Sequence, residues 1–132
     1  MNRPTVISVI DNEESILASV GSLVRSMGFT VRLFYSAETF VCSSSFADTI
    51  CLIVDVQMPG MSGLELQALL NKSGSQIPII FITGFAEPSI RRRAIDGGAV
   101  CMLDKPFQSD ELIHCINRAL ASAAKSKNLF IS

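Results

Sequence analysis

Residues 50–63 of this chain read ICLIVDVQMPGMSG. The first five are apolar and rich in β-branched side chains, which is typical of a strand buried on both faces. Asp55 follows this run directly, Pro59 and Gly60 then break the chain, and Ser62 is a good N-cap for a leucine-rich helix. The stretch therefore predicts a strand, a loop that begins with a carboxylate, and a helix.

The same alternation extends in both directions from this stretch. Short apolar runs predict strands over 5–10, 50–54, 78–82 and 99–103, and an alternating pattern predicts one over 29–35. Apolar residues at helical spacing predict helices over 16–27, 62–70, 88–96 and from about 109. A shorter helix is predicted after Ser36, which caps it, and the serine run at 43–45 predicts the loop that follows this helix. Five consecutive βα units require parallel strands with right-handed crossovers. We therefore expect an α/β, flavodoxin-like doubly wound (βα)5 fold with a five-stranded parallel sheet in the order 2-1-3-4-5.

The chain length indicates one domain, because 132 residues bury a single core comfortably. We expect residues 1–122 to form this domain and residues 123–132 to be a helix end, linker or tail. Only 26 residues follow Pro106, too few for the last helix and a further domain. The chain is expected to be a stand-alone domain or a fragment.

Charge and composition argue against nucleic-acid-binding, membrane-spanning and secreted classes of protein. With 11 basic and 12 acidic residues the net charge is −1, which favours neither direct nucleic-acid binding nor an anionic membrane surface. Hydrophobic residues make up 48% of the chain, yet no apolar run approaches the roughly 18 to 20 residues of a membrane span. The N-terminus lacks the apolar core of a secretory signal, and Cys42, Cys51, Cys101 and Cys115 form no CxxC pair. We expect a cytoplasmic protein whose reduced thiols pack as small hydrophobes.

Polar residues follow four of the five predicted strands, where an open parallel sheet binds its ligands. They are Asp11, Asn12 and Glu13, then Asp55, then Thr83, and then Lys105. Carboxylates from neighbouring strand ends repel one another unless a cation lies between them, and oxygen ligands favour Mg²⁺. Asp55 would accept a phosphoryl group whose charge the metal and Lys105 neutralise. Singly, each residue is as well explained as a helix cap or turn residue; the shared location favours one site.

This set of residues resembles the receiver domains of response regulators from bacterial two-component systems. The matching motifs are the cluster at 11–13, Asp55 with MPGMSG at 58–63, Thr83-Gly84, and Lys105-Pro106-Phe107. The resemblance covers about residues 4–122. Around Asp55 and Thr83 it resembles regulators that carry a C-terminal helix-turn-helix output domain.

The resemblance implies a role for each residue. Asp55 would be the phosphoacceptor, Thr83 the switch hydroxyl, and Lys105 the phosphate-binding cation, with a cis bond to Pro106. The implied Mg²⁺ ligands are Asp11, Asn12, Asp55 and the main-chain carbonyl of Gln57. In this family phosphorylation changes the surface of helix 4, strand 5 and helix 5, here the segments 88–96, 99–103 and from about 109.

Two positions depart from the family pattern. Asn12 stands where a second carboxylate is usual, which predicts weaker Mg²⁺ binding because affinity depends on ligand charge. Met102 occupies the position of the aromatic switch residue, and its flexible side chain makes switching less defined. Phe85, two residues after Thr83, is expected to shield the acyl phosphate from water.

The leading hypothesis is a signalling domain rather than an enzyme. It would take a phosphoryl group from a sensor histidine kinase, catalyse the transfer itself, lose the group slowly, and homodimerise through the helix 4/strand 5/helix 5 surface. The alternative is a degenerate receiver that binds partners without phosphorylation. A flavodoxin-like cofactor binder or a phosphohydrolase is disfavoured, because no glycine-rich phosphate loop follows the first strand and no DxD motif begins at Asp55.

Two further features lie outside this set of strand-end residues. His114 lies within the last predicted helix, away from every strand end, and is assigned no chemistry. Arg91, Arg92 and Arg93 form a charge run that is usually a solvated helix face. Because their helix borders the surface that changes in the family, a partner contact is the alternative for them.

Overall fold

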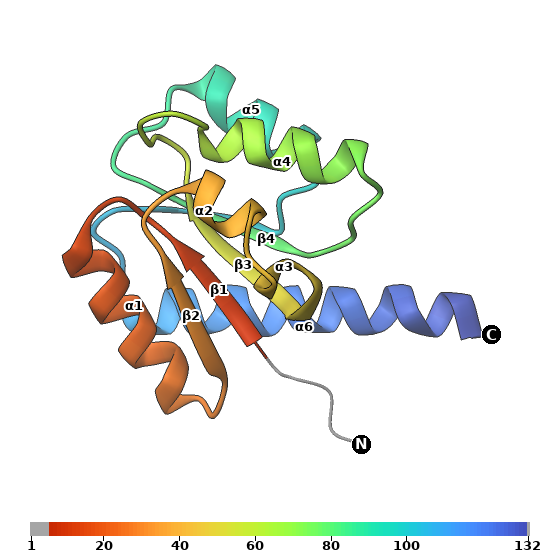
Figure 1. Cartoon of the computed structure of the whole chain (residues 1–132). Coiled ribbons are helices and arrows are strands. Elements are labelled where there is room, and N and C mark those ends of the chain that lie inside the picture. The colour runs from red at the N-terminus through yellow and green to blue at the C-terminus, as the bar shows by residue number, and fades with distance from the viewer. Residues whose placement is uncertain (1–5, 132) are drawn as a thin grey trace.

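The computed structural model describes residues 6–131, with side chains described through residue 122. The described residues form a sheet of five parallel strands in the order β2-β1-β3-β4-β5 (Figure 1). The strands are β1 (Val6–Ile10), β2 (Thr30–Phe34), β3 (Thr49–Asp55), β4 (Ile79–Thr83) and β5 (Cys101–Asp104). The predicted fold class and strand order are confirmed. Thr5, predicted to begin the first strand, lies outside the described residues.

Helices cover both faces of this sheet (Figure 1). They are α1 (Glu14–Ser26), α2 (Ala37–Val41), α3 (Ser45–Asp48), α4 (Gly63–Lys72), α5 (Pro88–Asp96) and α6 (Ser109–Ile131). Helices α1 and α6 pack on one face, while α2, α4 and α5 pack on the other. The bounds predicted for the helix at 88–96 match α5.

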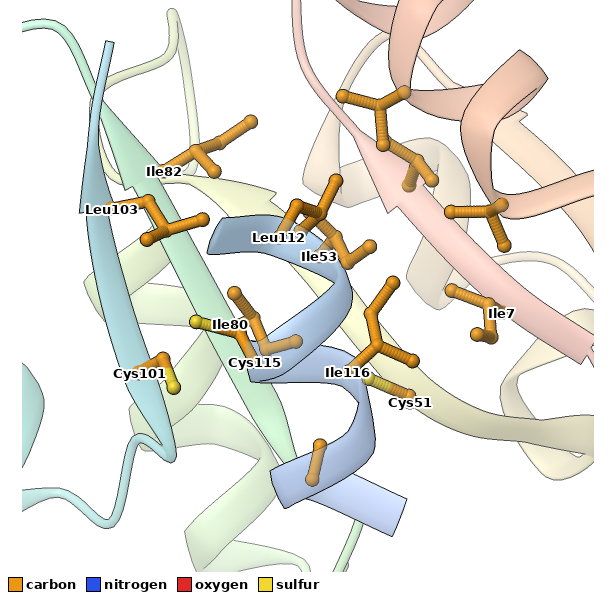
Figure 2. Close-up of a cluster of buried hydrophobic side chains, with 14 of the residues drawn as sticks. Ile7, Cys51, Ile53, Ile80, Ile82, Cys101, Leu103, Leu112, Cys115 and Ile116 are labelled. Atoms are coloured by element: carbon orange, nitrogen blue, oxygen red, sulfur yellow. The ribbon is translucent and has the colours of Figure 1, made fainter. Parts of the chain in front are cut away.

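Alternate residues of the central strand serve two separate cores. In β3, Cys51 and Ile53 face the cluster beneath α1 and α6, whereas Leu52 and Val54 face the cluster beneath α2, α4 and α5. Figure 2 shows the first of these cores, with α6 lying across the sheet. Burial on both sides explains why the central strands are apolar at nearly every position.

Helix α4 begins at a well-formed N-terminus. Ser62 accepts a hydrogen bond from the backbone N–H of Glu65, and the Glu65 carboxylate accepts one from the N–H of Ser62. This capping box satisfies two backbone donors that a helix start otherwise leaves unpaired. The prediction that Ser62 opens a helix is confirmed.

The segment between β2 and β3 differs from the prediction. The serine run at 43–45 predicts a loop, but Ser45 is buried and begins α3. Its hydroxyl accepts a hydrogen bond from Arg32 at 2.6 Å, and its carbonyl accepts one from the Thr49 hydroxyl at 2.6 Å. These partners from β2 and β3 override the local loop preference of a serine run.

The last helix extends well past the sheet (Figure 1). Helix α6 continues to Ile131, through most of the stretch predicted as helix end, linker or tail; Ser132 lies outside the described residues. Within the described part of the chain, every helix is too short or too polar to span a bilayer.

Candidate functional site

Two buried carboxylates meet at the carboxyl end of the sheet. The register of β1 and β3 pairs Ile10 with Val54, so the next residues, Asp11 and Asp55, emerge side by side. Asp11 is 0% exposed and Asp55 is 5% exposed. Such burial is unusual for aspartate and indicates that both carboxylates need a compensating partner.

Lys105 supplies part of that compensation from the end of β5. Its Nζ lies 3.0 Å from Asp11 Oδ2 and 3.3 Å from Asp55 Oδ2. The backbone N–H of Lys105 also donates to the Thr83 carbonyl at 2.7 Å, which fixes the lysine against the end of β4. The structure thus brings Asp11, Asp55 and Lys105 together, as the sequence predicted.

Glu13 joins this cluster, although sequence reasoning assigned it no ligand role. Its Oε1 lies 3.2 Å from Lys105 Nζ. The N–H of Glu13 donates to Asp11 Oδ1 at 2.8 Å, and this short turn directs the glutamate toward the lysine. The run of Asp11, Asn12 and Glu13 was the available signal, but the direction of each side chain depends on the turn. Asn12 is exposed.

The loop after Asp55 is tied down at several points. The N–H of Gln57 donates to Asp55 Oδ1 at 3.2 Å. Farther along, the N–H of Met61 donates to the carboxylate of Glu38 on α2 at 3.0 Å, and this bond lowers the pKa of Glu38. Sequence reasoning did not identify Glu38, since nothing local marks a contact with a loop more than twenty residues away.

Thr83 is buried at the end of β4, next to the cluster. Its hydroxyl donates to the Phe85 carbonyl at 2.9 Å and accepts from the Phe85 N–H at 3.2 Å. The hydroxyl is therefore held by its own loop in this structure. The Phe85 side chain is 69% exposed.

Electrostatics in the cluster are unbalanced, because three carboxylates face one ammonium. Burial, and then the charge of Asp11, raise the pKa of Asp55, against the opposing effects of Gln57 and Lys105. Burial alone would lower the pKa of Lys105, but its contacts with the carboxylates raise it overall. The site favours an additional cation.

The carboxylates also fit a metal ion on geometric grounds. One oxygen each from Asp11, Glu13 and Asp55 lies within 4.8 Å of the others. Asp11 Oδ2 is buried, and among the described residues no donor hydrogen bonds to it, since its contact with Lys105 is an ion pair without hydrogen-bond geometry. An acceptor in this state suits a hard cation such as Mg²⁺.

The remaining predicted residues surround this site. The Lys105–Pro106 peptide bond is cis, as the resemblance implied. Met102 is half-buried on β5, opposite Phe81 of β4, and packs toward the core beneath α4 and α5. Its role in switching, like the metal-binding role of Asn12, stays a prediction.

The doubly wound sheet carries its acidic residues and a lysine at the carboxyl edge, where domains of this open α/β class bind their ligands. The family model described as the response regulator receiver domain matches residues 7–117, and the chain belongs to this family.

Its relatives agree with this assignment. The chain is 41% identical over 127 residues to the response regulator protein TodT of Pseudomonas putida, covering 96% of this chain and 56% of TodT. Among solved structures, the response regulator StyR superposes with a TM-score of 0.87 at 35% identity, over 96% of this chain and 64% of StyR. The FixJ-N structure superposes with a TM-score of 0.79 at 32% identity, over 92% of this chain and 96% of the FixJ-N chain. This chain spans little more than half the length of TodT.

Proposed function

We propose that this receiver domain is a cytoplasmic, Mg²⁺-dependent switch that accepts a phosphoryl group on Asp55 from a sensor histidine kinase. One observation carries the proposal. The Lys105 ammonium lies within 3.3 Å of Asp11, Glu13 and Asp55. A lysine placed there is ready to neutralise phosphoryl oxygens on Asp55, and the carboxylates retain an excess of negative charge for a metal.

The transfer is a carboxylate substitution at phosphorus. An Asp55 oxygen forms a bond to the phosphorus, the bond from phosphorus to the donor imidazole breaks, and the imidazole keeps the electron pair and takes up a proton. The proposed metal ligands are Asp11, Asn12, Asp55 and the Gln57 carbonyl, and the position of Glu13 adds it as a candidate. Bound Mg²⁺ would supply positive charge to the phosphoryl oxygens.

Thr83 then links the phosphoryl group to the rest of the molecule. Its hydroxyl bonds to the Phe85 carbonyl at 2.9 Å, so it must leave this partner to donate to a phosphoryl oxygen on Asp55. Moving Thr83 releases the loop that carries Phe85, which leads into α5. The exposed Phe85 ring is then free to close over the acyl phosphate and slow its hydrolysis.

The proposal is tested by intact-mass analysis after incubation with acetyl phosphate, with and without Mg²⁺. We expect one phosphoryl addition that requires Mg²⁺, and Asp55→Asn should abolish it. Asp104→Asn is the matched control, because Asp104 is an exposed carboxylate at the end of β5 and should leave the addition unchanged. Equal addition to wild type and Asp55→Asn would sink the assignment of the acceptor.

A degenerate receiver that binds partners without phosphorylation is the second candidate. It is favoured by Asn12, which replaces a carboxylate with an exposed amide, and by Met102, which is only half-buried on β5. The candidates differ in a direct transfer assay from a phosphorylated histidine kinase. Failure of transfer, together with failure of acetyl phosphate at high Mg²⁺, would support the degenerate module.

For the whole protein we propose transcription control through an output domain outside this chain. The support is that TodT and its relatives are about twice as long as the matched region, and that FixJ is described as a transcriptional regulatory protein. The proposed output surface is formed by α5, β5 and α6. On it Arg91 Nη2 and Asp104 Oδ1 lie 2.8 Å apart, and a homodimer through this face would rearrange that pair.

A further inference from the structure

Three buried cysteines lie in the core between the sheet and α6 (Figure 2). Cys51 is on β3, Cys101 begins β5, and Cys115 is on the second turn of α6. In Figure 2 the Cys115 side chain extends from α6 toward β5, where Cys101 lies, whereas Cys51 lies on the other side of Ile116. A disulfide joins two such thiols where their Cα atoms approach within about 7 Å of one another.

The two facing thiols have different electrostatic surroundings. Arg118, one turn beyond Cys115, places Nη1 3.5 Å from Cys101 Sγ. A guanidinium at this distance stabilises negative charge that develops on the Cys101 sulfur as it attacks an oxidant. Burial, and then hydrogen bonding to Cys101, raise the pKa of Cys115 to about 12, so this residue stays a protonated thiol. The contact with Arg118 thus marks Cys101 as the member that meets the oxidant, and Cys115 as the member that resolves it.

Solvent reaches Cys101 more readily than Cys51, the third core cysteine. Cys101 is 7% exposed, whereas Cys51 is 0% exposed and its pKa is raised to about 12, first by burial. Arg118 and Val100 also line an open surface hollow of about 450 Å³ next to the start of β5. A small oxidant entering there reaches Arg118, whose guanidinium contacts Cys101.

We propose that Cys101 and Cys115 are an oxidative modification site that forms an intramolecular disulfide with hydrogen peroxide. The Cys101 sulfur attacks one peroxide oxygen, the O–O bond breaks, and the products are a sulfenic acid and one water. The Cys115 sulfur then attacks the Cys101 sulfur, the S–O bond breaks, and the hydroxyl leaves with the Cys115 proton as a second water. Two thiols are oxidised and one peroxide is reduced.

The disulfide ties β5 to α6. Both elements belong to the proposed output surface, so oxidation would restrict movement there whether or not Asp55 is phosphorylated. The site itself does not depend on the proposed function, since it rests on the thiols and Arg118 alone.

The test is peptide mapping of the folded chain after treatment with hydrogen peroxide. We expect the intact mass to fall by two hydrogen atoms, a linked pair of peptides containing Cys101 and Cys115, and reversal by dithiothreitol. The thermal midpoint should rise on oxidation, because the cross-link restricts the unfolded chain. The experiment uses Cys42→Ser to prevent links between molecules through the exposed Cys42.

Matched variants separate this pair from general thiol oxidation. Cys101→Ala and Cys115→Ala should each abolish the loss of two hydrogens, whereas Cys51→Ala should retain it. Arg118→Gln should slow disulfide formation several-fold without changing the linked pair. Peptide mapping of the chain with its core cysteines intact decides the matter if a core variant fails to fold.

Three results would overturn the proposal. One is a linked peptide that contains Cys51. Another is oxygen addition at Cys101 with no cross-link to Cys115. The third is no change in mass under conditions that oxidise the same chain in denaturant.

Discussion

The Lys105 ammonium neutralises only part of the negative charge around it. Asp11, Glu13 and Asp55 together carry three charges when ionised, and Lys105 supplies one of opposite sign. In the absence of metal this excess opposes folding, because the remaining carboxylate charges repel one another in a partly buried site. Binding of a cation relieves the repulsion and stabilises the folded state.

Asp55→Asn should therefore stabilise the metal-free protein at about pH 7 by about 0.5 to 2 kcal/mol. The folded-state pKa of Asp55 is raised, so its ionisation favours the unfolded chain, and wild-type stability falls as the pH rises through that pKa. At pH values below 3.8, the ordinary pKa of aspartate, the wild type and Asp55→Asn should have similar free energies of unfolding. Urea denaturation in EDTA across this range measures both effects.

The control for this change is Asp104→Asn. Asp104 forms an exposed ion pair with Arg91, and loss of this pair should lower the free energy of unfolding by at most about 1 kcal/mol. A stability loss in Asp55→Asn as large as that in Asp104→Asn would contradict the charge excess.

Metal affinity should follow the number of carboxylates at this edge. Asn12→Asp should tighten Mg²⁺ binding and Glu13→Gln should weaken it, each by roughly three- to tenfold, or about 0.7 to 1.4 kcal/mol. Isothermal titration calorimetry measures these affinities directly. Glu14→Gln removes the same charge from the first turn of α1 and should leave the affinity unchanged. If Glu13 and Glu14 behave alike, Glu13 is not a ligand.

The residue types at the site were predictable, but their directions were not. A position directly after a buried strand fixes where the Asp11, Asp55 and Lys105 backbones lie, and this is visible in the sequence. The place of Glu13 depends on the bond from its own N–H to Asp11 Oδ1, a turn that the residue types permit but do not require. The bond between Thr83 and Phe85 is of the same kind.

At the scale of elements, the start of α4 is the tightest junction near the site. A Cβ on Gly63 would collide with the carbonyl oxygen of Asp55 and meet Phe81 at 3.0 Å. Because backbone rather than a flexible side chain stands in the way, the loop would have to move. Glycine here allows the helix to begin directly against the strand that carries Asp55.

Gly63→Ala should destabilise the protein by about 1 to 3 kcal/mol, as other overpacked substitutions do. It should also slow phosphorylation by displacing Asp55. Gly84→Ala is the control, since nothing lies within 4 Å of its added Cβ, and its effect should stay within about 1 kcal/mol. Thermal unfolding and the acetyl phosphate assay test the pair. Equal effects of the two substitutions would show that close packing at Gly63 is unimportant.

Long, patterned elements were predicted well, and short ones were not. The α5 bounds and the Ser62 cap follow from local signals: Pro88 and the two glycines after the helix in one case, and a serine before leucines in the other. Helix α3 has four residues, too few for a periodic pattern. It forms because Ser45 bonds to Arg32 and Thr49, and such distant partners leave no local signal.

For the molecule as a whole, the strand order was predictable because the connection rules leave few arrangements of five βα units. Both faces of the sheet need helices, and α6 completes one of them with four buried residues, Leu112, Cys115, Ile116 and Ala119. Each buried leucine or isoleucine contributes about 1.5 to 3 kcal/mol. Helix α6 is therefore an integral part of the domain core.

We propose the domain boundary near residue 122 and predict that a chain ending there folds with stability within about 1 kcal/mol of the longer chain. The described core contacts of α6 end at Leu120, which is the physical reason. Urea denaturation of both chains measures the difference. A chain ending at Gln108 is the control and should fail to fold, since it lacks the whole helix. A large loss on removing only residues 123–132 would place them inside the domain.

The parallel order of the sheet also has a consequence for how the chain acquires its structure. Val6 pairs with Thr30 of β2 on one side and with Thr49 of β3 on the other. Strand β1 therefore gains its second neighbour only after the chain through α1, β2, α2 and α3 has been synthesised. Closing such loops precedes the gain from strand pairing, which makes folding slower than in helical bundles of this size. During synthesis β1 therefore keeps one edge of unpaired backbone N–H and C=O groups open until β3 has left the ribosome.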